Sequence, residues 1–493
     1  MKFQTVTKHF ANLRTPLLAA IIDPDDPLFC EEDFPLPREL ARLKKLAAQK
    51  KLECGLYTAR GADESGGGVY FLPIAAVKHF TGEERLRILA AQCLGEARER
   101  KAAKVTFALN APAGALWASA IIEGCMLADY RFDKYKSKDT QPEPEITVEL
   151  LVDSAGERAA KTALPRLKIM HNAVCFCRDL VNEPASVIYP ETLARAASKA
   201  AKASGLACEI LDDKAIVRKG YMGIHAVGKG SRHKPRLIIM RYIPKTGSSR
   251  QHHLALVGKA VTFDTGGICL KPPKDMWEMK GDMAGGAAVI AAMTAIARLK
   301  PRLRVTGIVP CVENAVGNDS GLPGDIIRTK TGKTIMVENT DAEGRLILID
   351  GLIRAKEEGA THAVDIATLT GAVVRALGTS IAGILGNDQD LISRVIECGK
   401  KAGEEYWQLP LWAEYRDMLK NDVADIANSS GQPNAGAITG ALFINEFVDP
   451  SIKWAHLDIA GTSLITKKWK YFSPGATGTG VRTLAELAED LAV

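Results

Sequence analysis

The segment Val337–Asp350 reads V-E-N-T-D-A-E-G-R-L-I-L-I-D, and the prediction of the fold starts from it. Asp341, Glu343 and Arg345 lie two residues apart, ahead of an apolar run. The side-chain period of a strand is two, so an extended segment would place all three charged groups on one face. Two carboxylates beside a hydrophobic strand are costly to bury unless a cation compensates them. Hard divalent cations prefer carboxylate oxygen, so the segment predicts a metal site beside a buried strand.

A second group of charged residues lies upstream, between Leu256 and Val289. We predict a buried strand at Leu254–Val257, followed by a loop that Gly266 and Gly267 make permissive. The loop region contains the charged residues Lys259, Asp264, Lys271 and Asp282. The run Asp282–Ala297 is small and apolar, which indicates a buried helix with Asp282 near its N-terminus, where the helix dipole favours an anion.

Four of the charged residues singled out in these two segments are carboxylates, and their number favours a metal site over separate structural roles. A single aspartate after a strand is more often a loop or capping residue than a metal ligand. Four negative charges buried together would be very costly without metal, and two divalent ions would balance them. The four are Asp264, Asp282, Asp341 and Glu343.

Three phrases of the sequence resemble the signatures of the leucyl aminopeptidase (cytosol aminopeptidase) family. They are G-K-A-V-T-F-D-T-G-G at 258–267, K-G-D-M-A-G-G-A-A at 280–288 and N-T-D-A-E-G-R-L at 339–346. Further matches follow in order at 178–185, 365–372, 434–443, 454–462 and 475–482. The resemblance covers the chain from about residue 170 to the C-terminus.

The resemblance implies two metal ions per chain, manganese or zinc, with two bridging ligands. One ion would be held by Asp264, Asp341 and Glu343, and the other by Lys259, Asp264, Asp282 and Glu343. Without the resemblance, Lys259 would be a counter-ion to the carboxylates, because an ammonium ligates metal only after losing its proton.

The resemblance also assigns roles to the two remaining positively charged side chains. Lys271 would stabilise the oxyanion that forms when water attacks a peptide carbonyl. Arg345 would hold a bicarbonate ion that acts as the base, whereas the structural alternative is pairing with Asp341 or Glu343. The wall of the substrate pocket would be formed by Met279, Thr368 and Gly371. The spacing of Met276, Met279 and Met283 is by itself typical of a core helix.

Length and pattern predict an α/β protein of two domains. A chain of 493 residues is too long for one ordinary core. We place a smaller N-terminal α/β domain at 1–165, ending in a linker helix from Ala155 to about Leu180, and a catalytic domain at 166–493. In the first, strands are expected at Leu17–Ile22, Val69–Pro73, Val105–Leu109 and Ile146–Val152, and helices at Gly82–Lys104 and Ala113–Tyr130. In the second, alternating strands and amphipathic helices predict a mostly parallel sheet flanked by helices.

Composition is that of a soluble globular protein, with 46% hydrophobic and 25% charged residues. The ten cysteines form no C-x-x-C pair, which favours reduced thiols and a cytoplasmic location. No stretch is expected to cross a membrane.

The predicted function is the release of N-terminal amino acids from peptides, with leucine-like residues preferred, by a homo-hexamer. The alternatives are a DNA-binding architectural hexamer of the same family and a catalytically silent homologue. The net charge of +6 and the basic cluster Arg98–Lys104 give nucleic-acid binding little support.

Some positions depart from the family pattern without removing a predicted ligand. Ala260, Thr265 and Gly351 replace glycine, serine and alanine, and the loop Asn314–Asp325 lacks its usual methionine and arginine.

Overall fold

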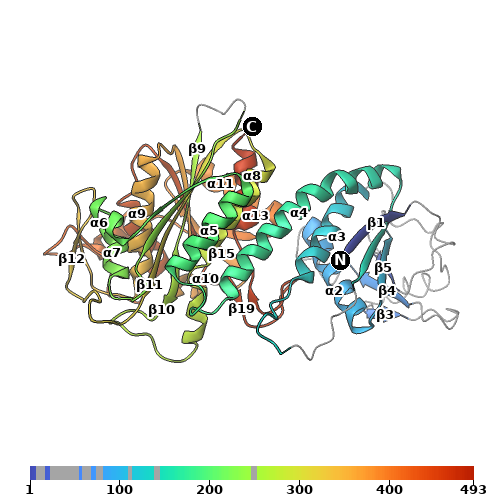
Figure 1. The fold of residues 1–493 in the computed structure, drawn as a ribbon, viewed down its shortest axis with the longest axis horizontal. Helices are drawn as coiled ribbons and strands as arrows, with labels where there is room; N and C mark the ends of the chain where they lie inside the picture. Colours follow the sequence, from blue (N-terminus) through green and yellow to red (C-terminus); the bar gives the residue numbers. More distant parts are fainter. Residues whose placement is uncertain are drawn as a thin grey trace. The chain divides into compact units, whose positions relative to one another are not determined.

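The computed structural model describes residues 1–6, 17–22, 55–57, 68–73, 82–108, 114–137, 145–245 and 252–492. The chain forms two compact units, shown in Figure 1. The first comprises residues 1–171 with 467–473, and the second residues 172–466 with 474–493. The predicted boundary at residue 165 lies inside helix α4 (Ser154–Asn182), which runs from the first unit into the second.

The first unit is built on a six-stranded sheet in the order β1-β6-β5-β2-β4-β3. Only the β3–β4 pair is antiparallel among these pairings. The strands are β1 (Lys2–Val6), β2 (Leu17–Ile22), β3 (Gly55–Tyr57), β4 (Gly68–Pro73), β5 (Lys104–Ala108) and β6 (Thr147–Leu151). Among the described residues of this unit, the helices besides α4 are α2 (Gly82–Glu99) and α3 (Gly114–Asp129).

Helix α2 is shorter than the sequence predicted. It ends at Glu99, because Lys101 adopts a left-handed conformation with φ 54° that stops the helix. The amide of Ala102 then donates to the carbonyl of Ala97, and the chain enters β5 at Lys104.

The second unit contains a nine-stranded sheet, with β16-β15-β18-β14-β9-β11-β8-β7 in order and β10 paired to β11. Its strands are β7 (Ala207–Leu211), β8 (Arg236–Tyr242), β9 (His253–Gly258), β10 (Ala260–Asp264), β11 (Arg304–Asn314), β14 (His362–Ala367), β15 (Ile381–Gly386), β16 (Glu405–Gln408) and β18 (Lys453–Asp458). The pairs along β16–β15, β18–β14–β9–β11 and β11–β10 are parallel, while β15–β18, β11–β8 and β8–β7 are antiparallel. The predicted α/β class with a mostly parallel sheet is confirmed.

Helices cover both faces of this sheet (Figure 1). Helix α8 packs with α5 and α13, helix α9 packs with α7 and α12, and both α8 and α9 contact β9 and β11. Strands β9 and β14 are buried along their whole length, which agrees with the mainly apolar residues of both. The helices are α5 (Pro190–Ser204), α6 (Asp213–Arg218), α7 (Met222–Gly228), α8 (Ala284–Leu299), α9 (Glu343–Glu357), α10 (Gly371–Leu377), α11 (Gln389–Ala402), α12 (Gly436–Asn445) and α13 (Val481–Asp490).

Shorter elements complete the second unit. They are the 3-10 helices η4 (Met276–Gly281) and η5 (Ala413–Leu419), the small sheet β12 (Ile326–Arg328), β13 (Thr334–Met336) and β17 (Ile426–Ala427), and the pair β19 (Leu464–Ile465) and β20 (Gly475–Ala476).

The prediction of an extended segment after Asp341 is wrong. Helix α9 begins at Glu343, and Asp341 lies in the turn before it. Successive residues of an α-helix are 100° apart, so Glu343 and Arg345 leave it in different directions. The apolar run Leu346–Ile349 is fully buried because α9 lies between the sheet and other helices. Period alone does not distinguish such a run from a buried strand.

One helical stretch of the second unit meets the length and composition of a membrane span. The stretch Met276–Leu299 is long and apolar enough to span a bilayer by length and composition. In the structure 78% of its apolar window is buried, and it contains η4 and the core helix α8. The α8 part of this stretch is a buried helix of the core.

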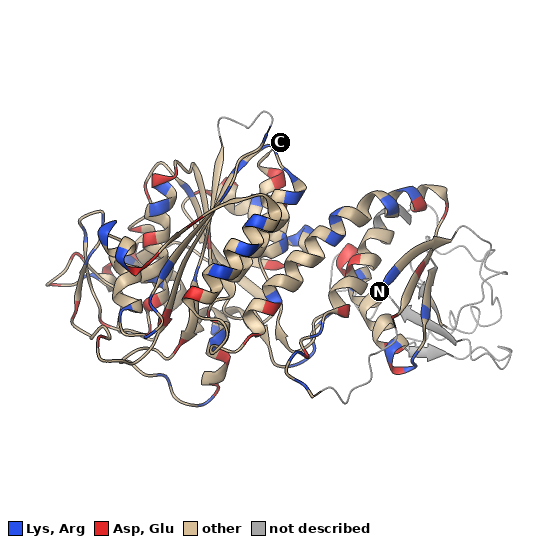
Figure 2. Ribbon diagram, viewed as in Figure 1, with Lys and Arg blue, Asp and Glu red and all other residues tan. Residues whose placement is uncertain are grey.

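The basic cluster Arg98–Lys104 is matched by acidic residues of the same unit. Arg98 pairs with Asp129, and Lys104 Nζ lies 3.5 Å from Glu149. Both signs of charge are interspersed along the helices in Figure 2. This distribution does not strengthen the nucleic-acid alternative.

Candidate metal centre

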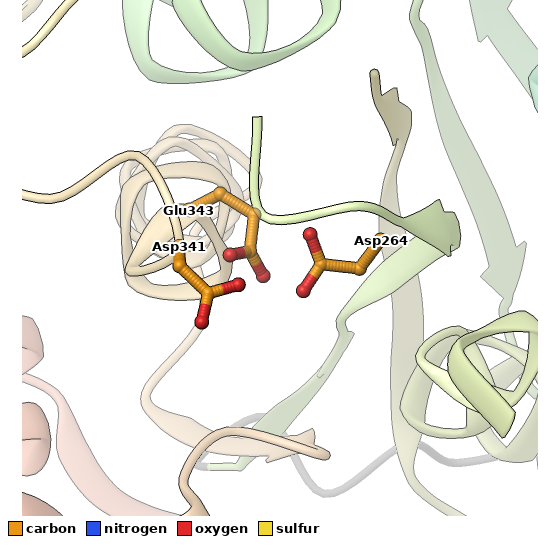
Figure 3. A group of neighbouring side chains, drawn as sticks. All are labelled: Asp264, Asp341 and Glu343. Carbon is orange, nitrogen blue, oxygen red and sulfur yellow. The ribbon is translucent and has the colours of Figure 1, made fainter. Parts of the chain in front are cut away.

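Three of the four predicted carboxylates meet where β10 ends and α9 begins (Figure 3). Asp264 is the last residue of β10, Asp341 lies in the turn before α9, and Glu343 is the first residue of α9. One ligand oxygen from each lies within 4.8 Å of the others. The fourth carboxylate, Asp282, lies between η4 and α8.

Asp264 is held by neighbours on two sides. Its Oδ1 accepts hydrogen bonds from the Gly266 amide at 2.9 Å and from Asn314 Nδ2 at 2.8 Å. Gly266 has φ 86°, and a Cβ there would meet the Cys269 carbonyl at 2.5 Å. The loop after β10 therefore requires glycine at this position.

Lys259 connects the remaining carboxylates. Its Nζ lies 2.8 Å from Asp282 Oδ1 and 2.9 Å from Glu343 Oε1, and it donates to the Thr368 carbonyl at 2.8 Å. Burial lowers the pKa of Lys259, but the surrounding carboxylates outweigh it and hold the pKa above its ordinary value. A Cβ on Gly344 would meet this Nζ at 2.8 Å, so glycine at this helical position leaves room for the lysine.

Lys271 contacts the two carboxylates that Lys259 does not pair with. Its Nζ is 2.9 Å from Asp264 Oδ2 and also pairs with Asp341. Burial again lowers the pKa of Lys271, but the carboxylates, Asp264 first, outweigh this effect and hold the pKa above its ordinary value. Lys271 is therefore a protonated hydrogen-bond donor at neutral pH.

Arg345 is buried, and within the described part of the chain its guanidinium forms no ion pair. Its Nη1 donates to the Asn428 carbonyl at 2.8 Å, and no ion pair to Asp341 or Glu343 is found among the described residues. In that same part of the chain its buried Nε has no hydrogen-bond partner. Burial lowers the pKa of Arg345 to about 10. The structural alternative for Arg345, pairing with those carboxylates, is therefore not what the structure shows.

The carboxylate cluster fits divalent cations. Asp282 Oδ2 and Glu343 Oε2 are buried and lack a hydrogen-bond partner within the described residues. Burial raises the pKa of Asp282, Asp341 and Glu343 above their ordinary values, and the nearby carboxylate of Asp264 adds to the effect. Ionised carboxylates in this position need positive charge beyond the two lysines, and oxygen donors suit hard cations.

The three predicted substrate-pocket residues lie on different elements. Met279 is half-buried on η4, and Gly371 is exposed at the start of α10, where a Cβ would meet nothing within 4 Å. Thr368 follows β14, and its hydroxyl donates to Asp282 Oδ1 at 2.7 Å. Thr368 thus also orients a predicted ligand, which its sequence position did not indicate.

The amino-acid sequence matches models of a known protein family. The family model described as "Cytosol aminopeptidase family, catalytic domain" matches residues 175–485, and the model of the family's N-terminal domain matches residues 77–139. A "Probable cytosol aminopeptidase" of Solibacter usitatus (strain Ellin6076) is 44% identical over 406 residues, covering 82% of this chain and 83% of the relative. The chain belongs to the cytosol aminopeptidase family.

Solved structures agree with this membership. A mutant of tomato leucine aminopeptidase has a TM-score of 0.85 at 31% identity, covering 99% of this chain and 96% of that chain. The bottromycin maturation enzyme BotP in complex with Mn has a TM-score of 0.82 at 31% identity, covering 97% and 100%. As a member of the cytosol aminopeptidase family, the protein is a peptidase, and the family supports a metal-dependent aminopeptidase activity.

The positions that depart from the family pattern are accommodated by their neighbours. Ala260 packs on Gly286, where an added Cβ would lie 2.6 Å from the Ala260 Cβ. At Gly351, a Cβ would meet Val257 Cγ1 at 2.5 Å, so the glycine brings α9 close to β9. The Thr265 hydroxyl donates to the Asn314 carbonyl at 2.8 Å. The loop Asn314–Asp325 lines part of a small pocket beside Gly267.

Sequence reasoning missed several residues that support the site. Asn314 and Asn428 contact Asp264 and Arg345, and the Thr340 hydroxyl accepts from the Cys269 amide and donates to the Gly266 carbonyl. The N-T-D-A-E-G-R-L phrase includes Thr340, but no spacing pattern connects Asn428 to it.

Proposed function

We propose that the protein is a two-metal aminopeptidase that releases N-terminal residues from peptides, with leucine-like residues preferred. The observation that supports this most is the meeting of four carboxylates with Lys259 and Lys271, with buried carboxylate oxygens left unpartnered among the described residues. One manganese or zinc ion is assigned to Asp264, Asp341 and Glu343. The second is assigned to Lys259, Asp264, Asp282 and Glu343.

The two cations outside the ligand set have separate roles in this proposal. When bound, the two ions would activate a water molecule, and bicarbonate would accept its proton. Lys271 donates to the oxygen that becomes negative as the peptide carbonyl is attacked, which suits its ammonium beside Asp264. Arg345 binds the bicarbonate, a role supported by its buried Nε, which lacks a partner in the described structure.

The substrate side chain is assigned to a pocket with Met279, Thr368 and Gly371 in its wall. Methionine is flexible and apolar, so a half-buried Met279 adapts to different aliphatic side chains. The open space at Gly371 leaves room for the substrate. We also assign a cytoplasmic location, which agrees with the names of the relatives.

Metal analysis and amide hydrolysis on one purified sample test this proposal. We expect two Mn²⁺ ions per chain, and no activity in Asp282→Ala and Glu343→Ala. Glu338→Ala, an exposed acidic residue of the same segment, serves as the matched control and should retain activity. A protein that binds no Mn²⁺ or Zn²⁺ and is insensitive to chelators contradicts the proposal.

The pH profile and an acetylated substrate test which end of the peptide is recognised. A metal ion binds the substrate's α-amino group only when it is neutral, and its pKa is about 7.7 to 8.0. Hydrolysis of leucine amide should therefore rise from neutral to mildly alkaline pH, and N-acetyl-leucine amide should be nearly inert. Comparable rates on the two substrates would point to another type of amidase.

A further inference from the structure

Asn428 is buried next to the metal centre but comes from a distant part of the chain. It follows strand β17, which pairs in parallel with β13, and its amide donates to the Met336 carbonyl at 2.9 Å. Its side chain is 0% exposed. This places Asn428 beside the segment that leads from β13 to Asp341.

The side chain of Asn428 binds the backbone of that segment. Its Oδ1 accepts from the amides of Glu338 at 2.8 Å and Asn339 at 3.2 Å. Its Nδ2 donates to the carbonyls of Asn339 at 2.7 Å and Ala342 at 3.4 Å. A primary amide has two donor hydrogens and two acceptor lone pairs, so its whole hydrogen-bonding capacity is directed to residues 338–342.

The backbone of Asn428 contacts the guanidinium of Arg345. Its carbonyl accepts the 2.8 Å hydrogen bond from Arg345 Nη1. The Asn339 side chain extends the same network, because its Oδ1 accepts from the Asp341 amide at 2.8 Å. One buried residue therefore joins the turn that carries Asp341 to the guanidinium of Arg345.

We propose that Asn428 is a positioning residue that sets the turn of Asp341 and the direction of Arg345 for the reaction. This inference rests on the proposed function of Asp341 and Arg345. Aspartate at this position has no amide hydrogen to give to the Asn339 carbonyl, and alanine has no hydrogen-bonding side chain. Outer residues that orient metal ligands typically affect metal affinity or activity by about 10- to 100-fold when mutated.

The test compares Asn428→Ala with Asn387→Ala. Asn387 makes a similar amide clamp in the same unit, because its Oδ1 accepts from the Trp454 amide at 2.7 Å and its Nδ2 donates to the Ile452 carbonyl at 3.1 Å. Trp454 pairs with Ala363 near the start of β14, whereas Thr368 of the metal centre follows the end of that strand. Both variants lose an amide clamp, but Asn428 is buried at the centre, whereas Asn387 is exposed and lies away from it.

Mn²⁺ binding by titration calorimetry and the separate values of kcat and KM are measured for both variants. For Asn428→Ala we expect weaker binding of one Mn²⁺ by about tenfold or more, and a kcat lowered by about 10- to 100-fold with little change in KM. Asn387→Ala should lower the melting temperature while Mn²⁺ affinity and kcat stay near wild type. If Asn428→Ala does not fold, Asn428→Asp is measured, and the same loss of Mn²⁺ affinity is expected.

The outcomes separate this inference from the proposed function. Wild-type Mn²⁺ affinity and kcat in a folded Asn428 variant overturn the positioning role, while an active wild-type protein leaves the aminopeptidase proposal intact. Equal losses in the Asn428 and Asn387 variants also overturn it, because they indicate a general structural effect. A wild-type protein that neither binds Mn²⁺ nor cleaves leucine amide would instead contradict the proposed function.

Discussion

The two lysines of the candidate metal centre differ in their carboxylate partners and in their exposure. Lys259 pairs with Asp282 and Glu343, whereas Lys271 pairs with Asp264 and Asp341. Lys259 is almost completely buried, with a side chain 3% exposed, while that of Lys271 is 22% exposed. The more accessible ammonium is the one that a substrate carbonyl can reach, which supports the different roles proposed for the two lysines.

Replacement of Lys271 tests whether this lysine stabilises the oxyanion. We expect Lys271→Ala to lower kcat by about 10²-fold, as is typical for the loss of one oxyanion donor, while the metal content stays near two ions per chain. Lys274→Ala, which removes an exposed lysine of the same loop, is the control and should change neither quantity. If metal content falls together with activity in Lys271→Ala, the lysine is needed to assemble the centre and is not the oxyanion donor.

Among the elements, helix α9 both carries residues of the candidate site and packs in the core of the second unit. Its first turn carries Glu343 and Arg345, and Asp350 farther along is 0% exposed. Asp350 Oδ2 accepts from the Ile224 amide at 2.8 Å, near the start of α7. A Cβ on Gly223 would meet the Leu346 carbonyl at 2.0 Å, so glycine lets α7 approach α9 closely.

The buried carboxyl of Asp350 predicts a pH dependence of stability. Burial raises its pKa from 3.8 to about 8 in the folded protein. Between these values the folded state holds a proton that the unfolded state has lost, so the contribution of Asp350 to stability falls as pH rises. Asparagine keeps an acceptor for Ile224 without a charge. The free energy of unfolding of Asp350→Asn relative to wild type should therefore increase from pH 5 to pH 8.

Urea unfolding at both pH values, with chelator present in every sample, measures this difference. An increase of more than about 1.4 kcal/mol, equivalent to one pKa unit, is expected. Asp319→Asn, at an exposed position, is the control and should show no such increase. Parallel pH curves for wild type and Asp350→Asn would show that Asp350 stays ionised when folded.

At the scale of the whole molecule, the second unit contains every residue of the proposed centre. The first unit contributes a separate sheet, and its basic cluster is paired with acidic residues. Family membership accounts for both units, because separate models of the family match them.

A further prediction for the whole molecule concerns its assembly. The family resemblance leads us to propose a homo-hexamer, and light scattering of the metal-loaded protein should give about six times the chain mass of 53.1 kDa. The same sample, mixed with duplex DNA at physiological salt, should show no co-elution. A monomer or dimer mass would contradict the hexamer, and stable co-elution with DNA would support the architectural alternative.

The sequence by itself determined the family, the α/β class and the identity of the carboxylates and lysines that meet at the centre. Mainly apolar strands such as β9 and β14 are local signals, because a fully buried strand needs apolar residues on both faces. The predicted ligand residues occur in short phrases whose order along the chain is itself informative. These features need no knowledge of which distant segments are neighbours.

Only the tertiary structure decided that Glu343 starts a helix, which lysine pairs with which carboxylate, and that Asn428 supports the turn of Asp341. A short apolar run fits a buried strand or a buried helix equally well, and packing between the sheet and other helices selects the helix. Asn428 and Asn339 are 89 positions apart in sequence, and the pairing of β17 with β13 brings them together. Such contacts depend on long-range packing, which local periodicity does not encode.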